Sequence, residues 1–557
     1  MSSAPVRPSL RARVAHWRVR YALLPFLATG TAVVLRAWNL DGFPYPNGDE
    51  GTYIAQAWAV RTGRGLSHYT YWYDHAPFGW MQLAALQQLL PSDAVPGELY
   101  LQQARWLMLP VAAATNALLY PLARRLGLSR ATAVAAMVLH ALSPLAIELE
   151  RQVFLDPFAT AWTLLALVLV LSPRRHLALY ALAGCCFALA VLSKETSLPV
   201  LPAVLWALWT HSRRGSRPFA LAAFVSGFLL VLLWPLYAVL NSELLPGTCH
   251  VSLVDTLLWQ LHDRPTSGSA FAPGTAAHAL ADRWVHRDGP LLAGGTLGAL
   301  AALADRRLRP LGLAVAVLTA FALRPGGYLP WMYVTQLLPF HALALAALCA
   351  RVLRPGRRGH TLLPRAVRPV AAVLLLAALS ALCAPRWYTL QREVQGADYT
   401  RSYEQAARWL KTAQLKDRHR LRLLTDEILW LEAVGSGFTP GAGAIWSYKL
   451  DKDASVASSL PRGWRDVDYV LSTIQVRASA TEKEMRGLRR LLKHAEPVAY
   501  FNEIKLLRIT DAVRRDRTIP DPPLLPDVAR CLEHSTDIWP YDGPGGKHAP
   551  PPADSGL

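Results

Sequence analysis

Two pairs of ionisable residues stand close together near the start of the chain. Asp49 and Glu50 lie in the stretch GDEGTYIAQAWAV, and Asp74 and His75 lie in YWYDHAPFGWMQLA. A carboxylate can take a proton from a hydroxyl group that attacks a substrate. The competing interpretation is structural, because carboxylates at a helix start bind its free backbone N–H groups. The Asp74–His75 pair could equally be a solvated turn.

A second set of charged residues lies farther along the chain. The segment ELERQVFLDP carries Arg151 and Asp156, and LSKET carries Lys194. Positive charge of this kind could stabilise a departing phosphate group. Each of these three residues could instead have a purely structural role. Arg151 could pair with a neighbouring glutamate, Asp156 before a proline could open a helix, and Lys194–Glu195 could be an interfacial ion pair.

These residues are set in a very apolar chain, since 52% of its 557 residues are hydrophobic and only 17% are charged. A soluble protein carries nearer ~25% charged residues, so the long apolar runs indicate a polytopic membrane protein. The formal net charge is +19. Much of the surplus consists of arginine pairs between the apolar runs, which is typical of cytoplasmic loops. We therefore expect no nucleic-acid partner.

The apolar runs predict about eleven transmembrane helices. They are residues 21–38, 104–122, 131–147, 155–171, 176–193, 198–210, 219–240, 290–304, 311–323, 330–350 and 367–384. Arginine pairs occupy alternate connections, and segment 1–20 is also basic, so the positive-inside rule places the N-terminus in the cytoplasm and the C-terminus outside. All the candidate residues then lie on the outer face, most of them near a span end. Polar groups at that depth usually mark a functional site.

The composition divides the chain into parts. A basic cytoplasmic segment, 1–20, precedes a transmembrane domain, 21–384, whose large outer loops are 39–103 and 241–289. Residues 385–511 alternate helical and strand patterns and predict a small external α/β domain, and the Pro-rich residues 512–557 predict a disordered tail. Within the first loop, Phe78–Leu90 is apolar but too short to span a bilayer, so we expect an interfacial or re-entrant helix.

The cysteines do not form a recognisable disulfide framework. Four of the six lie in or beside predicted spans, where a cysteine behaves as a small apolar residue. Cys249 and Cys531 are the two expected outside the membrane, where a disulfide bond between them could form. The sequence leaves that pairing open.

Several motifs resemble a known family when they are taken in order. They are the Asp-Glu pair after the first span, the aromatic-rich HxPxG element, the Arg-x4-Asp turn RQVFLD, and LSKET after the fifth span. In these features the chain resembles the C-type membrane glycosyltransferases, especially glycosyltransferase family 39 and its actinobacterial members. That family includes protein O-mannosyltransferases and lipid A aminoarabinose transferases. The resemblance implies an all-α polytopic fold with a small extracytoplasmic α/β domain.

The resemblance also implies roles for the acidic residues. Asp49, the first acid of its pair, matches the catalytic base of the family, and Asp156 matches the second essential acid. Glu50 would complete this catalytic group by shaping or ligating the site.

Other matched positions concern the donor. Arg151 and Lys194 match cations suited to a lipid phosphate, His75 lies where relatives place a basic group near that phosphate, and Asp74 is the candidate ligand of a divalent metal ion. The chain departs from the family at Ala76, since HAPFG replaces the usual HPPLG. This loosens the turn that holds His75.

The sequence therefore predicts a multi-pass glycosyltransferase of the cytoplasmic membrane that acts on the outer side. It would move a sugar from a polyprenyl-phosphate donor to a hydroxyl group, with inversion; the sugar and the acceptor stay open. A transporter or flippase for a lipid-linked or anionic solute is the rival interpretation, but it would require polar groups near mid-membrane. A non-catalytic scaffold relative is a second alternative, against which the presence of both Asp49 and Asp156 argues.

The arginine asymmetry makes the orientation testable. Cysteines introduced at Gly65 and Ser458 should react with a membrane-impermeant thiol reagent added to intact cells, whereas a cysteine at Gly215 should not. Labelling at Gly215 together with protection at Gly65 would reverse the predicted topology.

Overall fold

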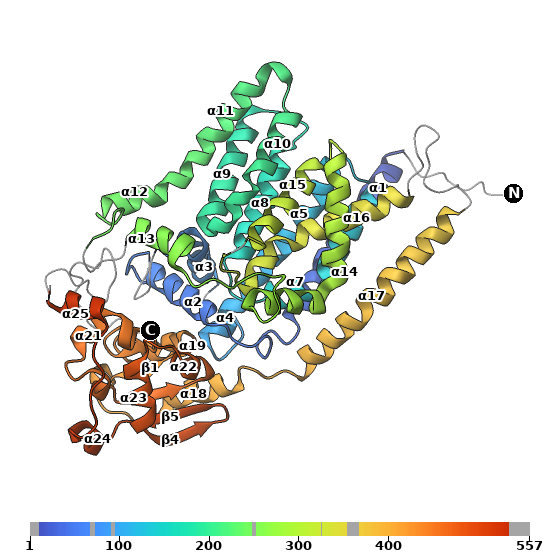
Figure 1. Ribbon diagram of the computed structural model, residues 1–557. Helices are drawn as coiled ribbons and strands as arrows, with labels where there is room; N and C mark the ends of the chain where they lie inside the picture. The colour runs from blue at the N-terminus through green and yellow to red at the C-terminus, as the bar shows by residue number, and fades with distance from the viewer. Residues whose placement is uncertain are drawn as a thin grey trace.

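The computed structural model describes residues 10–66, 73–90, 95–247, 252–324, 326–353 and 367–533. A helical bundle stands beside a smaller α/β domain, and the long helix α17 runs down one side of the bundle toward that domain (Figure 1). The α-helices of the bundle and its loops are α1 (Leu10–Ala37), α2 (Gly48–Arg61), α3 (Phe78–Leu89), α4 (Tyr100–Trp106), α5 (Met108–Arg125), α6 (Arg130–Leu142), α7 (Pro144–Leu149), α8 (Asp156–Val170), α9 (Leu177–Ser193), α10 (Leu201–His211), α11 (Arg217–Phe228), α12 (Leu233–Leu240), α13 (Leu253–Leu258), α14 (Ala276–Ala304), α15 (Arg309–Ala322), α16 (Leu338–Leu353) and α17 (Arg368–Gly396).

The predicted spans all coincide with helical segments. Among the residues that the structure describes, four segments are long and apolar enough to cross a membrane, namely Tyr100–Arg125, Arg214–Leu240, Trp331–Leu353 and Pro369–Thr412. Shorter apolar helices are Ala22–Ala37, Arg130–Leu142, Asp156–Val170, Leu177–Ser193 and Arg309–Ala322. The chain is thus a multi-pass membrane protein, as its composition predicts.

One predicted span is interrupted. Residues 131–147 form two helices, α6 and α7, because Ser143 ends the first and caps the second. Its Oγ accepts a hydrogen bond from the N–H of Ala146 at 3.2 Å, and Pro144 occupies the first turn of α7. The short apolar run 78–90 is a helix, α3, of 12 residues. This length agrees with an interfacial helix and is too short for a span.

The predicted external α/β domain is built on a five-stranded sheet with the order β2-β1-β3-β5-β4. Strands β2, β1 and β3 are parallel, whereas β5 is antiparallel to both β3 and β4. The strand patterns in the sequence predict β1, β3, β4 and β5, but not the short β2. The elements are α18 (Arg401–Thr412), β1 (Leu423–Thr425), α19 (Glu427–Gly435), β2 (Ala444–Trp446), α20 (Lys449–Lys452), α21 (Ala454–Ser459), β3 (Tyr469–Ser472), α22 (Ile474–Ser479), α23 (Arg486–His494), β4 (Glu496–Phe501), β5 (Ile504–Arg508), α24 (Asp511–Arg515) and α25 (Pro526–Glu533).

The edges of this domain differ from those expected. Helix α17 continues past the predicted boundary at residue 384 and ends at Gly396. Part of the predicted disordered tail is helical in α24 and α25, and Val528 of α25 is buried. Cys531 takes part in a disulfide bond, whereas Cys249 lies outside the described residues.

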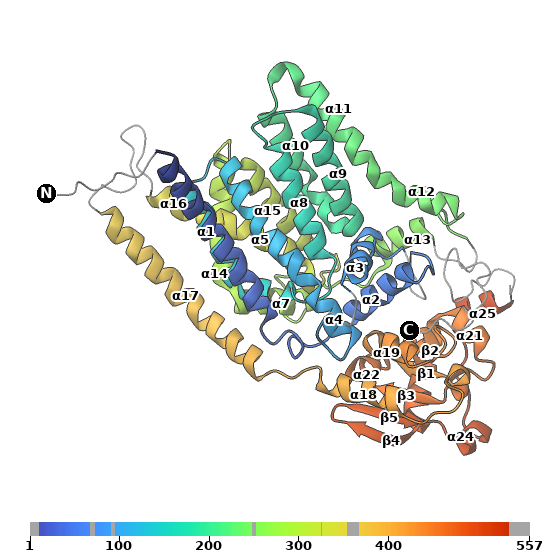
Figure 2. The same cartoon turned by 180° about the vertical axis from the view of Figure 1, so that it is seen from behind.

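Helix α2 is the junction between the bundle and the α/β domain. It lies between them in both views (Figures 1 and 2). The ring of Trp58 on α2 meets Trp430 on α19 edge-on, with 5.7 Å between ring centroids. At Gly51 the two backbones approach so closely that an added Cβ would lie 2.3 Å from the carbonyl oxygen of Glu427. A glycine is therefore required there, and α2 is held from both sides.

The close approach of α2 and α19 at Gly51 predicts what a methyl group added there would do. Gly51→Ala should force α2 and α19 apart and cost about 1–3 kcal/mol, the usual penalty of overpacking. The melting temperature in detergent should fall, and limited proteolysis should attack the α/β domain faster. Gly30→Ala is the matched control, because an added Cβ at Gly30 meets nothing within 4 Å. Equal stability of the two variants would contradict the tight junction.

Candidate active site

The first turn of α2 leaves the carboxylate of Asp49 free. Asn47 caps the helix: its Oδ1 accepts from the N–H of Asp49 at 3.0 Å, and Glu50 accepts from the N–H of Asn47 at 3.1 Å. The side chain of Asp49 is exposed, and none of the described residues hydrogen-bonds to its carboxylate. The capping role that would explain Asp49 structurally thus belongs to Asn47.

Glu50, by contrast, is a structural anchor. Its fully buried carboxylate accepts two hydrogen bonds from Arg105 of α4, at 2.7 and 2.9 Å. It also accepts from the side chain of Gln152 at 3.1 Å and from the N–H of Val153 at 3.0 Å. Both oxygens are therefore occupied. Glu50 shapes the site by fixing α2, and this geometry gives no support to a direct catalytic role.

Arg151 is likewise engaged in the fold. Its guanidinium donates to the backbone carbonyls of Ile147 (2.9 Å), Leu35 (2.6 Å), Trp38 (3.1 Å) and Phe43 (3.4 Å). The side chain is fully buried. A guanidinium committed to four carbonyls ties α7 to the end of α1. The predicted contact of Arg151 with a donor phosphate has no support in this arrangement.

Lys194 and His75 form a hydrogen-bonded pair at the C-terminal end of α9. The ammonium of Lys194 donates to Nε2 of His75 at 2.8 Å, so the proton of the ring is on Nδ1, which donates to Glu195 at 2.9 Å. Burial alone would raise the pKa of Glu195, but the hydrogen bond from His75 and the nearby ammonium of Lys194 hold it below the ordinary value. Glu195 thus holds the imidazole in place. The ammonium keeps N–H groups for an anionic ligand.

Asp156 faces this group from the start of α8. No side chain caps α8, so the role of a helix cap does not account for its carboxylate. Oδ1 accepts from Gln336 at 2.9 Å, whereas the buried Oδ2 has no hydrogen-bond partner among the described residues. Gln336 precedes α16 and also donates to Thr196 at 2.7 Å. The sequence contains no signal for Gln336, because this contact joins segments far apart in the chain.

Tyr53 lies at the centre of the predicted site residues. Its ring is 6.1 Å from that of His75, and Nζ of Lys194 is 6.0 Å from the ring centroid. Burial, and then the carboxylates of Asp49, Asp156, Glu195 and Asp74, raise the pKa of its phenol well above the ordinary value. The site thus gathers these acids around one buried tyrosine. Its position four residues after Asp49, on the same face of α2, was the available signal.

Asp74 completes the group of acids. Burial raises its pKa to about 6, although His75 and Arg264 act in the opposite direction. Among the described residues, no three histidine, cysteine or acidic side chains are grouped so that they could hold a metal ion. In the part of the chain that the structure describes, the candidate metal ligand Asp74 therefore has no cluster of further ligands around it of the kind that holds a divalent cation.

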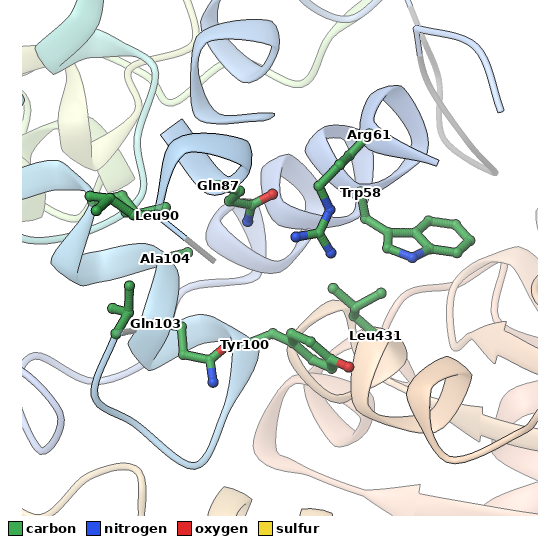
Figure 3. A pocket seen from close by; sticks show the side chains of 10 residues that line it. Trp58, Arg61, Gln87, Leu90, Tyr100, Gln103, Ala104 and Leu431 are labelled. Carbon is green, nitrogen blue, oxygen red and sulfur yellow. The ribbon is translucent and has the colours of Figure 1, made fainter. Parts of the chain in front are cut away.

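A small pocket lies at the other end of α2. Arg61 and Trp58 of α2, Gln87 of α3, Tyr100 of α4 and Leu431 of α19 line it (Figure 3). Arg61 is twelve residues beyond Asp49, which on an α-helix is a distance of about 18 Å. This pocket is therefore separate from the group around Tyr53.

Comparison with known proteins agrees with the fold. Residues 95–237 match the family model of dolichyl-phosphate-mannose-protein mannosyltransferases. No curated protein sequence matches the chain. Among solved structures, apo ArnT from Cupriavidus metallidurans superposes with a TM-score of 0.54 at 14% identity, covering 90% of this chain and 99% of that chain. The chain has the fold of ArnT. The C-type glycosyltransferase fold that the motifs predict is thus confirmed.

Two further structures describe ligands of proteins with this fold. ArnT from the same organism, bound to undecaprenyl phosphate, superposes with a TM-score of 0.53 at 12% identity, over 89% of this chain and 99% of that one. The oligosaccharyltransferase of Archaeoglobus fulgidus, in complex with Zn and sulfate, gives 0.50 at 15% identity, over 85% of this chain and 71% of that one.

Because Lys194 and Arg151 have different surroundings, we expect their substitution by alanine to have different effects on lipid binding and on stability. Lys194→Ala should weaken binding of a polyprenyl phosphate roughly tenfold or more, because it removes the ammonium expected to meet the phosphate. Arg151→Ala should instead lower the melting temperature, since each buried carbonyl left unpaired costs about 1–3 kcal/mol. Binding titrations and thermal melts of both purified variants distinguish the two. A stable Arg151→Ala protein with weak lipid binding would restore the phosphate role.

Proposed function

We propose that this protein is a membrane glycosyltransferase that takes a sugar from a polyprenyl-phosphate donor. The sugar passes to a hydroxyl group of an acceptor at the outer face of the cytoplasmic membrane, with inversion at the anomeric carbon. The N-terminus lies inside the cell, and the α/β domain that follows α17 lies outside.

One observation carries this proposal: the ammonium of Lys194 lies 6.0 Å from the ring of the buried Tyr53, on the helix that also carries the exposed carboxylate of Asp49. Among the described residues no side chain hydrogen-bonds to the carboxylate of Asp49, and Lys194, which donates to His75, keeps further N–H groups for an anionic ligand. The fold of ArnT supports the same chemistry, since ArnT binds undecaprenyl phosphate. The match of residues 95–237 to a family named for mannosyl transfer from dolichyl phosphate supports a lipid-linked sugar as donor.

The reaction divides between Asp49 and Lys194. Asp49 takes the proton of the acceptor hydroxyl while that oxygen attacks the anomeric carbon of the donor sugar. The bond between this carbon and the phosphate oxygen breaks, and the phosphate leaves with the electron pair as polyprenyl monophosphate. The ammonium of Lys194, oriented by His75, stabilises the charge that develops on the departing phosphate. One new glycosidic bond replaces the bond to phosphate.

The remaining residues position this chemistry. Asp156, held by Gln336 at 2.9 Å, keeps its second oxygen free for a hydroxyl group of the donor sugar or for Lys194. Glu50 fixes the start of α2 and with it the direction of Asp49. Tyr53 fills the centre and excludes water from the phosphate.

A substitution at Asp49 tests the proposal directly. Asp49→Asn keeps shape and hydrogen bonding but removes the proton acceptor, and general-base assistance contributes ~10²–10⁴ in rate. Transfer from radiolabelled polyprenyl-phosphate sugars should fall by that factor, while the melting temperature and the binding of undecaprenyl phosphate should stay close to wild type.

Asp398→Asn provides the control, because Asp398 is an exposed acid whose ion pair with Arg401 is 3.8 Å long. It should transfer sugar normally. Near-normal transfer by Asp49→Asn would show that Asp49 is not the base. Movement of the intact donor across a vesicle membrane, without cleavage, would favour a flippase.

A further inference from the structure

The α/β domain places a carboxyl group beside the proposed base. Glu427 is the first residue of α19, and its backbone contacts Gly51 of α2. An added Cβ at Gly48 would lie 3.3 Å from Oε2 of Glu427. The side chain of Glu427 therefore covers the first turn of α2, the turn from which Asp49 projects.

A neutral side chain fixes this carboxyl group in place. With its amide nitrogen toward Glu427, Gln475 donates to Oε2 at 3.2 Å, and its amide oxygen accepts from the N–H of Gly48 at 3.1 Å. Gln475 belongs to α22 of the same domain. The contact thus runs from the α/β domain to the start of α2 through two side chains of that domain.

The charges that act on Glu427 are negative. Burial, the largest cause, together with Asp426 before α19 and Asp49 of α2, raises its pKa to about 8, although a hydrogen bond from its own backbone N–H acts in the opposite direction. Asp426 is committed to the fold, since it accepts from the N–H of Leu429 at 3.0 Å and from the hydroxyl of Tyr403 at 3.2 Å. From α22 the adjacent group is the neutral Gln475. At neutral pH the carboxyl group of Glu427 therefore keeps its proton and can donate it in a hydrogen bond.

We propose that Glu427 is an acceptor-positioning residue and that the acceptor is a carbohydrate. The inference rests on the proposed function, because Asp49 must be the base. Asp49 takes the proton of one hydroxyl, while the neighbouring carboxyl group of Glu427 donates to an adjacent oxygen of the same molecule. Two acidic side chains side by side suit two vicinal hydroxyl groups, as on a sugar ring. An acceptor with a single hydroxyl group, such as a serine side chain, leaves one of the two acidic side chains without a partner.

The pairing of Glu427 with Asp49 predicts that the KM for the acceptor depends on pH. As the pH rises through about 8, Glu427 loses its proton, can no longer donate, and adds a second negative charge beside Asp49. The KM for the acceptor should then rise while donor binding is unchanged. Glu427→Gln keeps a donor at every pH, so its acceptor KM should stay flat across this range.

The experiment uses full-length protein, a radiolabelled polyprenyl-phosphate sugar that the wild type consumes, and three acceptors. These are a methyl glycoside, its deoxy analogue without the neighbouring hydroxyl, and a serine-threonine peptide. Glu427→Ala should raise the KM for the glycoside roughly tenfold, the value of one hydrogen bond to a polar group, and should not affect the deoxy analogue. Glu427→Gln should stay within about threefold of wild type at pH 7. Glu482→Gln, an exposed acid paired with Lys452 at 2.7 Å, is the matched control.

A stability measurement tests the protonation without activity. Between the ordinary value of 4.5 and about 8, folded Glu427 holds a proton that the unfolded chain lacks. The stability of the wild type should therefore fall as the pH rises through this window, and it should fall less in Glu427→Gln. Parallel melting curves for the two proteins would overturn the assignment of a protonated carboxyl.

The remaining outcomes are distinct. An active wild type whose kinetics are unchanged in both Glu427 variants overturns the inference but leaves the proposed function standing. Transfer to the peptide and not to the glycoside overturns the carbohydrate acceptor. A wild type that consumes no lipid-linked sugar overturns the proposed function, and the inference with it.

Discussion

The buried ion pair between Glu50 and Arg105 is the contact on which the candidate site depends. One carboxylate joins the start of α2, helix α4 and the turn before α8, through Arg105, Gln152 and Val153. Removing one partner of such a pair typically costs about 3–5 kcal/mol, because the other charge stays buried and uncompensated. Typical domains have only about 5–15 kcal/mol of stability. The same contact sets the positions of both Asp49 and Asp156, which are close to it in sequence.

The fold follows from the sequence wherever a local pattern dictates it. Apolar runs and flanking arginines predict the helical segments, because the bilayer imposes both length and polarity on them. The break at Ser143–Pro144 was missed, since hydropathy is continuous across it and only the cap reveals the second helix. Strand β2 has three residues and forms only because β1 lies beside it. Such elements depend on partners that local sequence does not contain.

The same distinction holds for the site. His75, Asp156 and Lys194 lie close together beside Tyr53 of α2, the helix that also carries Asp49. Arg151 was predicted for the same site, yet it donates to four backbone carbonyls of the fold, and no pattern in the sequence around Arg151 predicts those contacts. Charge and position predict which residues are available. Long-range packing decides which of them remain free to meet a ligand.

Helix α17 has a consequence for how this sequence can change. No residue in the most apolar stretch of α17 is buried within the protein, so the bilayer constrains only the length and the apolar character of that stretch. Exchanges among leucine, valine and alanine there are nearly neutral, whereas at the junction of α2 even one methyl group collides with backbone. Substitutions can therefore accumulate along lipid-facing helices without cost. Variation at lipid-facing positions of this kind is compatible with the ArnT fold at only 14% identity.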